Sequence, residues 1–100
     1  MKDYVLIVEK RIIQLFVDNN TATAGSILMP NQVLHAINEL YLEYDKEKIK
    51  EYGPWESSSK LMLKALNSLR EQGLLSENKI IRLTEKGERY IRDKIYNLHG

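Results

Sequence analysis

Lysine, serine and asparagine recur along one side of the segment from Ser57 to Gln72. Projected at 100° per residue as an α-helix, that side carries Ser57, Lys60, Lys64, Asn67 and Glu71, flanked by Ser59 and Arg70. The opposite side carries the apolar residues Met62, Ala65, Leu66 and Leu69. Lysine can bind guanine acceptors or phosphates, and asparagine can pair with adenine through both ends of its amide. The alternative is an ordinary solvated helix face, which carries the same residue types.

No arrangement in the sequence suits catalysis or metal binding. The chain has no cysteine, and its two histidines, His35 and His99, lie far apart. Glu39 and Glu43 are one helical turn apart but have no neighbour that would tune them for acid–base chemistry. No glycine-rich phosphate loop is present. We therefore predict a protein that is not an enzyme, with no catalytic residue, no metal site and no cofactor.

The residues after Gly73 indicate a short β-hairpin over 74–83. Two apolar strands flank a turn at Glu77-Asn78-Lys79, where asparagine tolerates the positive φ of tight turns. Lys79 and Arg82 are candidate phosphate contacts beside the helix. The hairpin is too short to read bases along a groove.

This order of an amphipathic helix, Gly73-Leu74-Leu75, a hairpin and Leu83-Thr84-Glu85-Lys86-Gly87 resembles a winged helix-turn-helix domain of the MarR/PadR type. The resemblance implies a mainly α fold with a small β-hairpin wing. It also implies sequence-specific binding of double-stranded DNA, with the helix over 57–72 in the major groove. The DNA-binding residues implied in this way are Ser57, Ser59, Lys60, Lys64, Asn67, Arg70, Lys79 and Arg82.

The remaining elements complete one domain over residues 1–100. We expect helices over 3–18, over 30–44 with a possible extension to 52, over 57–72 and over 84–98. Ser26 to Met29 is a candidate first strand beside the hairpin. Leu61 and Leu63, at the boundary of the third helix, are expected to be buried. Residues 45–56 depart from the family pattern, in which three or four residues join the two helices.

The first helix carries two apolar stripes, although a surface helix of a monomer needs one. Val5, Val8, Ile12, Leu15 and Phe16 form the predicted core stripe. The second stripe packs either on the C-terminal helix of the same chain or on a second copy, and we favour the homodimer. The predicted dimer interface comprises Leu6, Ile13, Val17, Tyr90 and Tyr96.

Charge is divided unevenly along the chain. The net charge is +1, but residues 1–56 sum to −3 and residues 57–100 to +4, so the basic excess lies on the segment predicted to meet phosphates. No signal peptide and no membrane-spanning stretch are evident, and we expect a cytoplasmic protein with no membrane partner. The leading prediction is a small homodimeric transcriptional regulator, working as a repressor by occupancy. The alternative is a winged-helix module for protein–protein contact in a larger complex.

Overall fold

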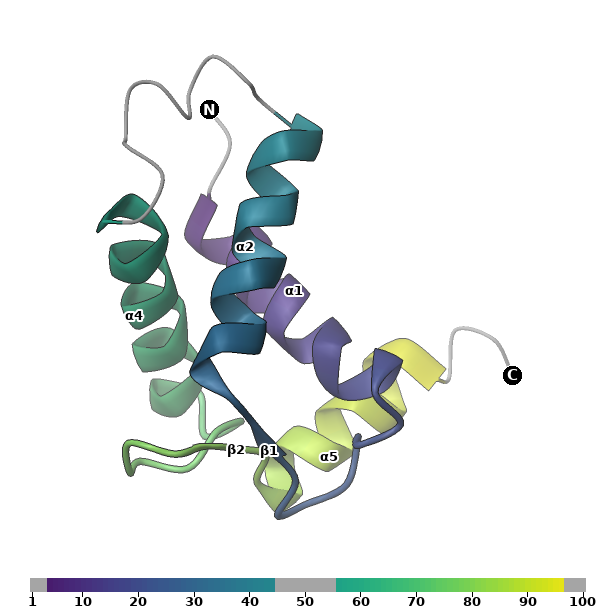
Figure 1. Cartoon of the computed structure of the whole chain (residues 1–100). Helices are drawn as coiled ribbons and strands as arrows, with labels where there is room; N and C mark the ends of the chain where they lie inside the picture. Colours follow the sequence, from purple (N-terminus) through teal and green to yellow (C-terminus); the bar gives the residue numbers. More distant parts are fainter. Residues whose placement is uncertain (1–3, 45–55, 97–100) are drawn as a thin grey trace.

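The computed structural model of the chain describes residues 4–44 and 56–96, with only the backbone for residues 41–44, 56–58 and 96. It is mainly helical, with a small two-stranded antiparallel sheet (Figure 1). In chain order the elements are α1 (Tyr4–Asp18), β1 (Ile27–Leu28), α2 (Pro30–Tyr44), α4 (Glu56–Glu71), β2 (Ile81–Arg82), α5 (Glu85–Ile91) and the π-helical turn η1 (Arg92–Tyr96). The predicted extension of the second helix to 52, and the last residues of the C-terminal helix, lie outside the described residues.

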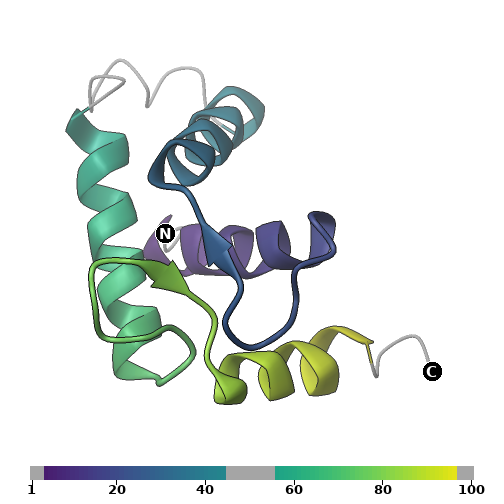
Figure 2. The same ribbon diagram turned by 60° about the horizontal axis from the view of Figure 1, so that its bottom comes forward.

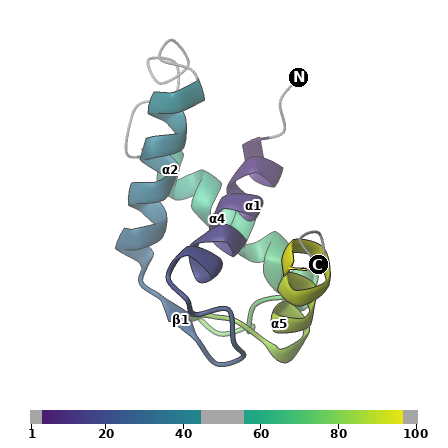
Figure 3. The same cartoon turned by 90° about the vertical axis from the view of Figure 1, so that its right-hand side faces the viewer.

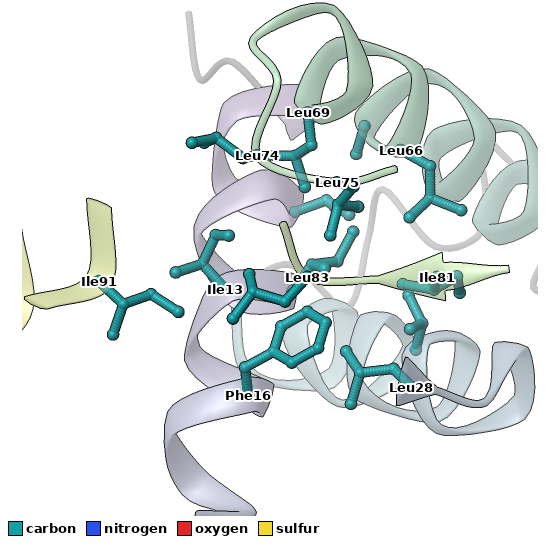
Figure 4. Close-up of a cluster of buried hydrophobic side chains, with 14 of the residues drawn as sticks. Ile13, Phe16, Leu28, Leu66, Leu69, Leu74, Leu75, Ile81, Leu83 and Ile91 are labelled. Carbon is teal, nitrogen blue, oxygen red and sulfur yellow. The ribbon is translucent and has the colours of Figure 1, made fainter. Parts of the chain in front are cut away.

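The helices and the sheet enclose one hydrophobic core. Figure 3 shows α1 between α2 and α5, with α4 behind it. The α1 face predicted from its spacing is confirmed, because Val8, Ile12 and Phe16 are buried. The sheet side of the core is drawn in Figure 4. The remaining members of the core cluster are Ile13, Leu28, Val33, Ile37, Ala65, Leu66, Leu69, Leu74, Leu75, Ile81, Leu83 and Ile91.

The sheet joins distant parts of the sequence. β1 pairs antiparallel with β2, with Ile27 opposite Arg82 and Leu28 opposite Ile81, so the predicted first strand is confirmed. The hairpin is less regular than predicted, because its first arm is reduced to a single bridge between Leu75 and Leu83. Side chains alternate across the sheet, so one side of β1 and β2 faces the core and the other faces outward.

The loop 76–80 turns through a side chain rather than through a positive φ. The Asn78 Oδ1 accepts a hydrogen bond from the Ile80 N–H at 3.2 Å and lies 3.0 Å from the Ser76 Oγ. Among the described non-glycine residues, Asn20 has a positive φ and Asn78 does not. The predicted backbone conformation at Asn78 is therefore wrong, because the amide stabilises the turn instead.

Glycine and threonine fix both ends of the segment from α4 to α5. Gly73, at φ +79°, ends α4, and the Leu74 N–H donates to the Leu69 carbonyl at 3.0 Å, as in a Schellman motif. Thr84 caps α5, since its Oγ1 accepts from the Gly87 N–H at 3.0 Å. A Cβ on Gly87 would collide with the Leu74 carbonyl oxygen and the Leu83 side chain. Glycine at this position therefore allows the close approach of α5 to residues 74 and 83.

Candidate nucleic-acid interface

Packing against α1 fixes which face of α4 points outward. Ala65, Leu66 and Leu69 are buried in the core. At the same junction Glu9, only 8% exposed, accepts two hydrogen bonds on its Oε1. The donors are the Ser68 Oγ at 2.6 Å and the Gln72 Nε2 at 2.7 Å. We call these two hydrogen bonds, from Ser68 and Gln72 to Glu9, the clamp between α1 and α4. Because the clamp lies beside the apolar stripe, it resists rotation of α4 about its own axis.

Four exposed side chains lie together on the outward face of α4. Lys60, Leu63, Lys64 and Asn67 follow the i, i+3, i+4, i+7 spacing of neighbours on a helix, and we call them the α4 quartet. Leu63 is 54% exposed. The prediction that Leu63 is buried is wrong, because no element within residues 4–44 and 56–96 covers this side of α4, whereas Leu61 does pack partly against the core.

Arg70 has a different environment from the one predicted for a phosphate contact. Its side chain is half-buried, and its Nη1 donates to the Asn67 Oδ1 at 3.3 Å. Its Nε is buried without a partner among the described residues. Arg70 therefore positions the Asn67 amide from one side.

The loop 76–80 lies beside the C-terminal half of α4 in both Figure 1 and Figure 2. Lys79 is exposed in this loop, and Arg82 is half-buried on β2. The structure thus brings the loop that carries Lys79 close to the C-terminal half of α4.

The cations of this surface are not neutralised by the residues that the structure describes. Lys60, Lys64 and Lys79 form no ion pair with any of those residues. One carboxylate, Glu71, is exposed near the C-terminal end of the same α4 face. Glu71 therefore lowers the positive charge at the C-terminal end of this face.

Two predicted serines are only partly placed. α4 begins at Glu56, one residue earlier than predicted, so Ser57 lies within its first turn. The Ser57 side chain lies outside the described residues, and Ser59 is half-buried at the edge of the face.

The predicted dimer interface is corrected at one position. Ile13 is 4% exposed and belongs to the chain's own core, so it offers a partner little surface, although it also lines the groove described below. Val17 is partly buried against the same core. Leu6 and Tyr90 are exposed; the Tyr96 side chain lies outside the described residues.

A groove of about 300 Å³ separates α1 from α5 and η1. Its walls include both exposed members of the predicted interface, Leu6 and Tyr90, and its rim includes Lys10 and Lys94. The second apolar stripe of α1 thus divides between the core and this groove.

The outward side of the sheet carries an apolar patch that the sequence analysis did not identify. Ile27, Met29 and Ile80 are exposed, Met29 by 62%. They alternate with the buried Leu28 and Ile81, so the strand period of two is the signal that would have grouped them.

The described part of the chain contains neither a candidate metal site nor a helix that could span a membrane. It contains no group of three or more histidine, cysteine, aspartate or glutamate side chains placed to hold a metal ion. No described helix is long and apolar enough to cross a membrane.

Comparison of the chain with protein-family models, with curated proteins and with solved structures finds no significant match.

Proposed function

We propose that this chain is a winged helix-turn-helix protein that binds double-stranded DNA in a sequence-specific manner. The observation that carries the proposal is the α4 quartet. It places two lysines that form no ion pair with the described residues, and an oriented asparagine amide, on one exposed helix face, next to a loop with a further lysine. An α-helix with this face fits the width of the major groove.

The order of the elements supports the same reading. The chain runs through α1, β1, α2 and α4, then through the pairing of Leu75 with Leu83, and ends in α5. This order is compatible with the family that the sequence resembles. β1 lies beside β2, where that fold places its first strand.

In the proposed complex, the outward face of α4 from Lys60 to Asn67 enters the major groove. Lys60 and Lys64 bind phosphates or guanine acceptors, and Asn67 binds adenine. Lys79 and Arg82 hold the backbone from the loop side. Glu71 keeps the C-terminal end of α4 away from the phosphates, since like charges repel.

We further propose that the protein acts as a homodimeric transcriptional regulator that represses by occupying its site. Leu6 and Tyr90, exposed on either side of the groove, are the contacts that a second copy would cover. Two copies would present two α4 helices to half-sites about one helical turn apart, roughly 34 Å.

Fluorescence anisotropy with a random duplex of about 30 base pairs tests DNA binding. At low salt we expect a dissociation constant in the micromolar range, rising steeply with salt because bound phosphates release counterions. Absence of binding at micromolar protein and low salt would overturn the proposal. Selection from a random duplex pool should then return sites with two-fold symmetry. Sedimentation at high protein concentration should give a dimer, with twice the 11.7 kDa mass of one chain.

The sheet patch of Ile27, Met29 and Ile80 favours a second candidate function, a module for protein–protein contact. Exposed apolar clusters mark sites of contact with protein partners. Replacing Met29 and Ile80 with serine separates the two functions. The DNA-binding proposal expects unchanged affinity for DNA, whereas the alternative expects no DNA binding by the wild type and loss of a protein complex in the variant.

A further inference from the structure

Leu63 interrupts the polar face of α4 and is 54% exposed, with no element covering it in the part of the chain that the structure describes. Its neighbours on the helix surface include Lys60, three residues earlier, and Asn67, four residues later. Residues three or four apart on a helix have Cβ atoms about 5–6 Å apart. A partner that covers Leu63 must therefore also meet a lysine and an amide, and Lys64 lies on the adjoining part of the same face.

The polar side chains of Lys60, Lys64 and Asn67 restrict the kind of partner that can cover Leu63. An apolar protein surface would have to remove the charges of Lys60 and Lys64 from water without pairing them, which is costly. The major groove of DNA offers phosphates for the lysines, and it carries one apolar group of its own, the 5-methyl of thymine. The sheet patch of Ile27, Met29 and Ile80 differs, because the cation opposite Ile27, Arg82, is half-buried.

The Asn67 amide fixes where such a contact would lie. Because the Arg70 Nη1 donates to the Asn67 Oδ1, the amide NH₂ is directed away from Arg70 and can donate to adenine N7. The Oδ1 retains a second lone pair for the adenine N6–H. Leu63 precedes Asn67 by about one helical turn, so it faces a base pair close to that adenine.

We propose that Leu63 is a specificity-determining residue that contacts the 5-methyl group of a thymine near the adenine bound by Asn67. This inference rests on the proposed DNA-binding function and adds to it a preference for thymine over cytosine at one position. Asn67 and Leu63 together favour A·T pairs, while Lys60 and Lys64 supply the affinity.

The test uses the full chain and a duplex selected from a random pool. Each thymine of the selected half-site is replaced in turn by deoxyuracil, which removes the methyl group alone, and binding is measured by anisotropy. We expect one position at which deoxyuracil weakens binding by about fourfold, the factor given by one buried methyl group. Leu63→Ala should bind the thymine and deoxyuracil duplexes equally, and Leu63→Met should keep the discrimination.

Ile80→Ala is the matched control, because it removes an exposed aliphatic side chain from the sheet patch. It should retain the full preference for thymine. The inference is overturned if the wild type binds the selected duplex with no position sensitive to deoxyuracil, or if Leu63→Ala keeps the preference. It is also overturned if Leu63→Ala changes the sedimentation of the free protein, since Leu63 then contacts a protein. Failure to bind any duplex would overturn the proposed function itself, a distinct result.

Discussion

Basic side chains on two surfaces of this molecule have different surroundings. On the surface shared by α1 and α2, the Arg11 guanidinium lies 3.6 Å from the Asp18 carboxylate and 3.7 Å from that of Glu39. On α4, Lys60 and Lys64 have no carboxylate partner among the described residues. A paired cation contributes little to the field outside the protein, whereas an unpaired one attracts polyanions. The pairing, more than the number of basic residues, separates the two surfaces.

The largest expected effect comes from removing the unpaired charges. Lys60→Ala with Lys64→Ala should lower DNA affinity on the order of 50-fold at 0.1 M salt, because each lost phosphate contact removes about 0.9 from the salt slope. Anisotropy over a salt series measures both quantities. Lys86→Ala with Arg89→Ala is the control, since it removes the same net charge from exposed positions on α5; equal losses in both double variants would refute the difference between the surfaces.

The clamp between α1 and α4 gives the next effect. Glu9→Ala leaves the Ser68 hydroxyl and the Gln72 amide without their acceptor, and it should lower the free energy of unfolding by about 2 kcal/mol. Glu9→Gln keeps one acceptor oxygen and should lose about half as much. Urea denaturation measures both. Full stability of Glu9→Ala would show that apolar packing alone orients α4.

Glu71 should oppose DNA binding. Glu71→Gln removes an exposed carboxylate from the α4 face and should raise affinity about threefold, the effect of one unit charge roughly 6–7 Å from a phosphate in water. Anisotropy at low salt measures the change. Glu85→Gln, the same charge change at the start of α5, is the control, and an equal gain in both variants would attribute the effect to net charge.

The smallest effect is expected at the paired cation. Arg11→Ala breaks two exposed ion pairs of more than 3.5 Å and should change stability by less than about 1 kcal/mol. DNA affinity should change by less than about twofold, because the Arg11 charge is already balanced locally. A loss comparable with that of the Lys60 and Lys64 variant would place Arg11 in the DNA interface.

Local rules predicted much of the fold. The 3.6-residue period of apolar side chains predicted the positions of α1, α2 and α4. Gly73 and Thr84 marked where α4 ends and where α5 begins. These features depend on residues close in sequence, so they can be predicted from one amino-acid sequence.

The errors arise where a distant element decides burial. A helical projection gives the direction of Leu63 and Ile13 but not which element lies there. Ile13 is covered by parts of the core far away in sequence, while Leu63 is left exposed. The prediction of a positive φ at Asn78 failed for a different reason. The Asn78 side chain accepts a hydrogen bond from the Ile80 N–H and stabilises the turn without a positive φ.

The bonds made by Thr84 also bear on the order of folding. Its Oγ1 lies within hydrogen-bond distance of the Gly73 and Leu74 carbonyl oxygens, eleven and ten residues earlier in the chain, and it caps α5 at the same time. Loop-closure entropy for so short a separation is small, whereas pairing Ile27 with Arg82 closes most of the chain. Contacts that close short loops form fastest. We therefore expect the end of α4, the loop and the start of α5 to assemble early, before the strand from the N-terminal half completes the sheet.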